Sequence, residues 1–81
     1  MKLVHVRDDI FDLSDGKRLL HAVIRIGEEG EYEVIGPPAG LSASAAPEVM
    51  EEISGLLAGL DAEYLAVVAM GAREWRGGVE F

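Results

Sequence analysis

Apolar and polar residues alternate along the first half of the chain, and this alternation predicts β-strands. Residues 2–7 follow it, and the pattern resumes at residues 10–13 after an interruption at Asp8 and Asp9. A β-bulge or a loop at the two aspartates accounts for the interruption, because a bulge changes the face on which later residues lie. We therefore expect a half-buried first strand at residues 2–7 that residues 10–13 continue. A turn at Ser14-Asp15-Gly16-Lys17 follows it.

The clearest strand covers residues 19–26, and residues 31–35 return antiparallel to it. A two-residue loop of Glu28 and Glu29 would set apolar residues opposite glutamates. A three-residue loop that ends at Gly30 makes every cross-strand pair compatible, and Gly30 supplies the left-handed residue that such a loop requires. The pairs are then Ile26 with Tyr32, Arg25 with Glu33, and Ile24 with Val34.

Helical spacing begins after a proline-rich exit loop at residues 36–40. Ser42 or Ser44 is expected to cap this helix, with Pro47 in its first turn. One stripe of the helix is apolar: Val49, Ile53, Leu56, Leu57 and Leu60.

The apolar run from Tyr64 to Met70 predicts a last strand buried on both faces, although its alanines also allow a second helix. The expected fold class is therefore α+β, with residues 1–81 forming one domain. Its mostly antiparallel sheet has four strands in the order βββαβ, or five if residues 79–81 add an edge strand, and one amphipathic helix packs on one face.

Composition narrows the function classes. The 81 residues are 49% hydrophobic and 27% charged, with a formal net charge of −8 and seven scattered basic residues. Such a chain lacks the clustered cations that bind nucleic acid, and its charge repels anionic membranes. There is no cysteine, which excludes disulfides and thiolate sites. The first residues lack the apolar region of a signal peptide, so we expect a cytoplasmic protein.

The chain also has no Asn, Gln or Thr, which is a tendency of thermophilic proteins but also a consequence of GC-rich coding.

Candidate catalytic chemistry is sparse. The acidic residues between Asp8 and Asp15 lack the closing glutamate of a calcium loop, so a solvated strand edge explains them better. His5 and His21 would bind zinc with an aspartate if they met on one face, but surface or structural histidines are the more common case. We therefore assign no metal, no cofactor and no catalytic residue.

The segment Arg73-Glu74-Trp75-Arg76 holds the only tryptophan of the chain, between two arginines. Tryptophan and arginine are enriched in interface hot spots, so Arg73, Trp75 and Arg76 are the candidate partner-binding residues. The alternative is that Trp75 folds back and covers one end of the core.

Three features carry a partial family resemblance: the acidic hairpin of residues 28–34, the exit Pro37-Pro38-Ala39-Gly40, and Glu51-Glu52 on the following helix. With them, residues 19–60 resemble the core domain of HicB-type antitoxins, which implies a βββαβ domain and a toxin-neutralising role. The chain lacks the fuller exit signature and DNA-binding extension of that family, and it has an extra N-terminal strand.

Three hypotheses of function follow. The first is a small acidic protein-interaction module, antitoxin-like or inhibitor-like. The second is a self-assembling structural subunit of a phage or multi-protein assembly, and the third is an enzyme or metal site that uses His5 and His21. The expected partner is a protein or a second copy of the chain, with a dimer favoured.

Overall fold

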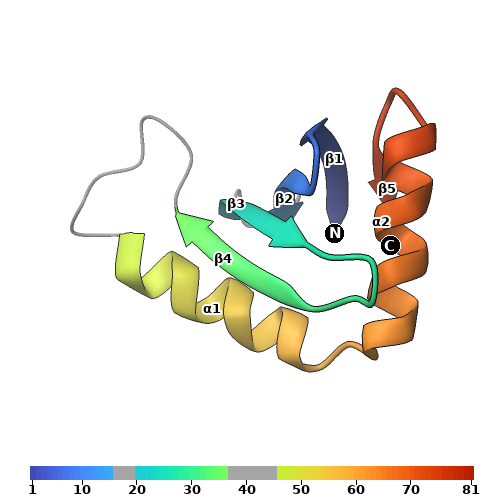
Figure 1. Ribbon diagram of the computed structural model, residues 1–81. Helices are drawn as coiled ribbons and strands as arrows, with labels where there is room; N and C mark the ends of the chain where they lie inside the picture. The colour runs from blue at the N-terminus through green and yellow to red at the C-terminus, as the bar shows by residue number, and fades with distance from the viewer. Residues whose placement is uncertain (16–19, 37–45) are drawn as a thin grey trace.

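The computed structural model describes residues 1–15, 20–36 and 46–81 (Figure 1). Its elements in chain order are strands β1 (Lys2–Arg7), β2 (Ile10–Asp15), β3 (Leu20–Ile26) and β4 (Tyr32–Gly36), helices α1 (Ala46–Ala58) and α2 (Ala62–Glu74), and strand β5 (Val79–Glu80). The expected turn at residues 16–17 and the expected helix caps Ser42 and Ser44 lie outside the described residues.

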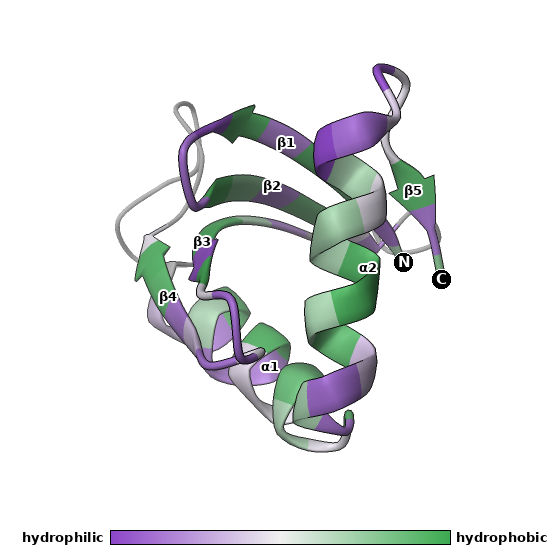
Figure 2. Ribbon diagram, turned by 45° about the vertical axis from the view of Figure 1, so that its right-hand side comes forward, coloured by the Kyte–Doolittle hydropathy of each residue, from purple (hydrophilic) through white to green (hydrophobic). Residues whose placement is uncertain are grey.

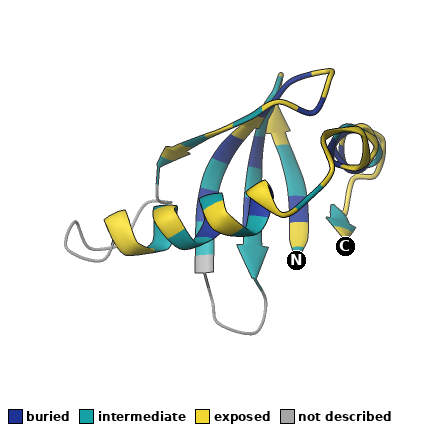
Figure 3. Ribbon diagram, turned by 90° about the horizontal axis from the view of Figure 1, so that it is seen from below, coloured by how far each residue is buried: buried dark blue, intermediate teal, exposed yellow. Residues whose placement is uncertain are grey.

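The five strands form one antiparallel sheet in the order β4-β3-β2-β1-β5. Helix α1 packs against β3 and β4, and α2 packs against β1, β3 and β5. The two helices thus carry the chain from the β4 edge of the sheet to the β5 edge. Figure 3 shows α1 in front of the strands and α2 nearly end-on.

The core lies between one face of the sheet and the two helices. Alternation along the strands directs Leu3, Phe11, Leu13, Ala22, Ile24 and Ile26 toward the helices, where each is at most 1% exposed. Six helix residues close the core from the other side: Ile53, Leu57, Leu65, Val68, Ala69 and Ala72. The opposite face of the sheet, which we call the open face, is not covered by any described residue.

The predicted hairpin between β3 and β4 is confirmed in its register. Ile26 pairs with Tyr32, Arg25 with Glu33, and Ile24 with Val34. Gly30 has φ of +86°, as the three-residue loop requires.

The expected order βββαβ with a single helix is wrong, and the order is ββββααβ. The interruption at Asp8-Asp9 is a tight turn in which Asp8 has φ of +45°. The chain therefore reverses there, and residues 2–13 form two paired strands rather than one, with a register shift between His5 and Arg7. The edge strand expected near residues 79–81 is present as β5.

The strand expected at Tyr64 to Met70 is also wrong, because this segment belongs to α2. The Asp61 carboxylate accepts a hydrogen bond of 2.8 Å from the Glu63 backbone N–H and so caps the helix. The segment is not buried on both faces, because Val67 is 65% exposed. Its alanines, which allowed a helix, favour one by intrinsic propensity.

No single helix among the described residues is long and apolar enough to cross a membrane. Helices α1 and α2 together have the length and apolar composition of a membrane span, but the pair is bent by 110° at the break between the two helices.

We predict that Gly30→Ala lowers the free energy of unfolding by at least about 2 kcal/mol, because a side chain there is strained at positive φ. A β-carbon at Gly30 would also lie 1.8 Å from the Ala62 carbonyl oxygen. Urea denaturation measures the change. Gly55→Ala is the matched control, because Gly55 lies within α1 with nothing near its β-carbon position. This substitution should raise the free energy of unfolding by about 0.5–1 kcal/mol. Equal stability of the wild type and Gly30→Ala would contradict this account.

Candidate surface for protein interaction on helix α2

The outward side of α2 carries several large apolar side chains that are exposed to solvent. The helix turns Leu65, Val68, Ala69 and Ala72 toward the sheet. At 3.6 residues per turn, the opposite side of the helix carries Glu63, Val67, Met70 and Glu74. We call these four residues the α2 row, and all four are exposed.

The middle of the α2 row is apolar and the ends are charged. Val67 is 65% exposed and Met70 is 63% exposed, and Tyr64 beside them is 47% exposed. Figure 2 shows α2 as hydrophobic in its middle and hydrophilic at both ends. Large apolar side chains that are this exposed on one helix mark an interaction surface more often than isolated ones do.

A hollow of about 230 Å³ lies beside the α2 row, between α2 and the turn that follows β3. Its lining includes Ala66, Ala69 and Met70 from the helix and Gly27 and Glu28 from the turn. Small residues on both sides leave the space open. On the turn side, the Glu31 carboxylate folds back over Gly27 and accepts a hydrogen bond of 3.2 Å from the Glu29 backbone N–H.

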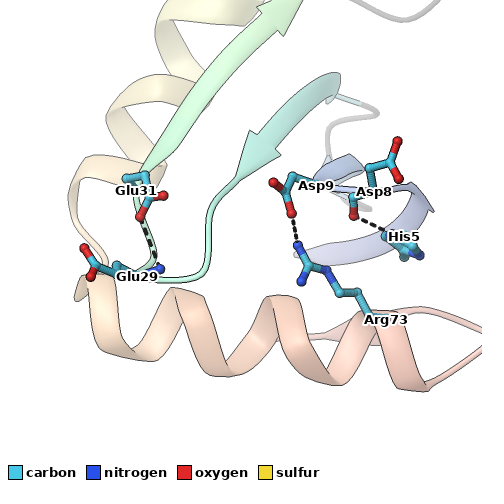
Figure 4. A network of polar contacts seen from close by, with 6 residues as sticks. All are labelled: His5, Asp8, Asp9, Glu29, Glu31 and Arg73. Atoms are coloured by element: carbon cyan, nitrogen blue, oxygen red, sulfur yellow. Dashed lines mark hydrogen bonds and ion pairs between the residues drawn. The ribbon is translucent and has the colours of Figure 1, made fainter.

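Helix α2 is tied to the sheet at its last turn (Figure 4). The Arg73 guanidinium donates to the Asp9 carboxylate in the turn between β1 and β2. It also lies 5.5 Å above the centre of the Phe11 ring, close enough for a cation–π interaction. Within the turn, His5 Nε2 donates to the Asp8 carbonyl oxygen over 2.8 Å, with its ring 5.3 Å from that of Phe11.

The structure separates the predicted partner-binding residues by role. Arg73 is engaged with Asp9 and Phe11, so its first role is to hold α2 in place. Trp75 follows the helix and is 68% exposed, so the alternative in which it covers the core is wrong. Trp75 and Arg76 line a shallow hollow of about 540 Å³ with Glu74 and Gly77, which extends the exposed surface beyond the end of α2.

The hypothesis of a zinc site that uses both histidines is wrong, because the sheet separates them. His5 is two residues from the buried Leu3 and so lies on the same, helix-covered face, whereas His21 is adjacent to the buried Ala22 and so lies on the open face. Within the described residues, no group of three His, Asp or Glu side chains is placed to hold a metal ion.

The open face does bring a serine, a histidine and an aspartate together. Ser14 is opposite His21 in the register, and His21 Nδ1 lies 3.7 Å from Asp12 Oδ1. The Asp12 oxygen is shielded from solvent but has no hydrogen-bond partner. The side chain of His21 is 43% exposed and that of Asp12 is 40% exposed. Water therefore reaches this surface, whereas an acyl-transfer site excludes it.

Sequence reasoning missed the α2 row because it assigned residues 64–70 to a strand. A signal was present in Asp61, a favoured N-cap residue, and in small or aliphatic residues at helical spacing from Leu65 to Ala72. On a helix, those positions put Val67 and Met70 outside.

Comparison of the chain with protein-family models, with curated proteins and with solved structures found no match.

We predict that Arg73→Ala lowers the free energy of unfolding by about 1 kcal/mol, because it removes an exposed ion pair and a cation–π contact together. In a double-mutant cycle with Asp9→Asn, urea denaturation should give a coupling of about 0.5 kcal/mol. Arg76→Ala, at an exposed position outside the helix, should change stability by less than about 0.5 kcal/mol. If the two arginine variants are equally stable, Arg73 is not the anchor of α2.

Proposed function

We propose that the protein is a small acidic protein-interaction module that docks a partner protein along the outward side of α2. The observation that carries this proposal is the α2 row, in which Val67 and Met70 are each nearly two-thirds exposed on one helix face. The buried hydrophobic core, as far as the structure describes it, does not use this face. The helix therefore has two apolar sides, one for the sheet and one for a partner.

Covering the row would contribute useful binding energy. Burial of an aliphatic side chain stabilises by about 1.5–3 kcal/mol when complete, so covering Val67 and Met70 is worth roughly 1–2 kcal/mol each. Tyr64 and Trp75 add large rings at the edge of the same surface, which is the kind of residue that anchors interfaces. The hollow beside Ala66 offers a place for one apolar side chain of the partner.

The surface is also rigid, which lowers the entropic cost of binding. Asp61 caps the first turn of α2, and Arg73 ties the last turn to Asp9. Between them the buried side chains of the helix lie against the sheet. A partner would therefore meet a preformed helix face.

A narrower form of this proposal is an antitoxin or inhibitor, which would act by covering a site on its partner. Its support is the resemblance of residues 19–60 to HicB-type antitoxin cores and the net charge of −8. The partner-binding residues Trp75 and Arg76 would then extend the α2 surface at its end.

A second candidate is self-assembly through the open face of the sheet, as a structural subunit would use it. The observation that favours it is that the described strand residues of this face include as many basic as acidic side chains, in a strongly acidic chain. Residues opposite each other in the register share a face, and the register places three basic and three acidic residues there: Lys2, Arg7, Arg25, Asp12, Glu33 and Glu80. Two copies would meet on this face without net charge repulsion.

We predict that Val67→Ser with Met70→Ser removes partner binding and leaves the fold intact. Affinity purification from the host, with quantitative mass spectrometry, should recover one partner with the tagged wild type and at least tenfold less with the double variant. Gly55→Ala, which changes α1 at an open position, is the control and should recover the wild-type amount. Equal recovery with the double variant would remove α2 as the docking surface.

For the second candidate we predict a mass of twice 8.7 kDa in light scattering at about 100 µM. Val23→Lys, in the middle of the open face, should return the mass to that of one chain, because it adds uncompensated charge to the contact. Val67→Ser on α2 should leave the doubled mass unchanged. A single-chain mass for the wild type at this concentration excludes the second candidate.

A further inference from the structure

Two carboxylates bracket the apolar pair of the α2 row. Glu63 precedes Val67 by one helical turn, and Glu74 follows Met70 by one turn. The two glutamates are eleven residues apart, which is about 16 Å along the helix axis at 1.5 Å per residue. Both are exposed, and among the described residues neither carboxylate has a hydrogen bond or ion pair with another side chain.

The hollow beside the row adds a third carboxylate, because Glu28 lies at its edge and is exposed. The one cation that lines this hollow, Arg73, already donates to Asp9. Arg76 is the nearest other cation in the sequence, and it lies beyond the end of the helix. The apolar centre of the surface therefore has acidic groups on three sides.

This charge pattern argues against a second copy of the chain as the occupant. An antiparallel pair of α2 helices that sets Val67 against Met70 of the second copy also sets Glu63 against Glu74 of that copy, because both pairs have the same midpoint. A parallel pair sets each glutamate against its own equivalent. Either arrangement brings like charges together at both ends of the contact, which disfavours it.

We infer that the partner presents a basic amphipathic helix, in which an apolar stripe is bracketed by lysine or arginine side chains that pair with Glu63 and Glu74. This inference rests on the proposed docking function of α2 and specifies its partner. Apolar contacts to Val67 and Met70 supply affinity, and the two carboxylates select a cationic partner and set its position along the helix. The net charge of −8 accelerates the encounter with such a partner.

The test uses a displayed library of 20-residue helical peptides with randomised surface positions, selected against the full chain. The wild type should enrich peptides that have Lys or Arg at two positions ten or eleven residues apart, with apolar residues between them. Glu63→Lys with Glu74→Lys should instead enrich Asp or Glu at those positions. Glu48→Lys with Glu51→Lys makes the same charge change at exposed positions on α1, so it should enrich the wild-type peptides.

Affinity measurements then give the size of the effect. An exposed ion pair is worth roughly 0.2–1 kcal/mol, or about 1.5- to 5-fold in Kd. We therefore expect Glu63→Gln with Glu74→Gln to weaken binding of the best basic peptide by about tenfold at low salt, and by much less at 0.5 M salt. Circular dichroism of each variant checks that α2 is retained.

The outcomes separate the inference from the proposed function. One outcome is that the selected peptides bind the wild type, fail to bind Val67→Ser with Met70→Ser, and show no charge preference. It would overturn the inference of a basic partner but would still support α2 as the docking surface. Peptides that bind the serine variant as well as the wild type would overturn both, as would a library from which the wild type selects nothing.

Discussion

Within the described residues, the sheet is covered by helices on only one of its faces, and the arrangement of these elements depends on that constraint. The part of the chain that the structure describes supplies two helices of thirteen residues each, which together cover one side of five strands. Every strand residue that belongs to the core therefore comes from the same side of the pleat. Both helices have to lie there as well, and each one keeps an outward side that the fold does not use.

Helix α2 packs against the sheet through a narrow stripe of buried residues. Two of its four buried residues are alanines, Ala69 and Ala72, so the helix approaches the sheet closely. The inner side has two large apolar side chains, Leu65 and Val68, while Tyr64, Val67 and Met70 lie exposed elsewhere on the helix. The inward packing and the outward α2 row are thus two results of one sequence pattern.

The sequence predicts those parts of the fold that short-range rules decide. The hairpin at Gly30 is an example, because the pairing of apolar with apolar residues selects one loop length. The stripe of α1 is another, since Ile53 and Leu57 are buried as the helical spacing indicates. At Tyr64 to Met70 the prediction relied on the apolar run, and a short apolar run fits a strand and a helix equally well. The Asp61 cap and the alanines favour the helix, and the packing of α2 against β1 and β3 stabilises it.

The candidate site also has a part that residue types predict and a part that only the fold reveals. Arg73, Trp75 and Arg76 were proposed from residue type alone, and all three are exposed at or just beyond the last turn of α2. The separate role of Arg73 could not be found in this way, because Asp9 is 64 residues away in sequence and only the fold brings the two together. Val67 and Met70 were not predicted as exposed residues, because the segment from Tyr64 to Met70 was assigned to a buried strand.

The pairing of β1 with β5 sets the mechanical behaviour of the molecule. Lys2 lies opposite Glu80, and backbone hydrogen bonds of 2.6 and 2.7 Å join Met1 with Phe81. A force that separates residues 1 and 81 therefore acts across the strands and opens these bonds one after another, like a zipper, instead of shearing them all at once. Strand β5 would peel away from β1 first under such a load, and α2 would lose its contacts with β5 before the ladders among β1 to β4 opened.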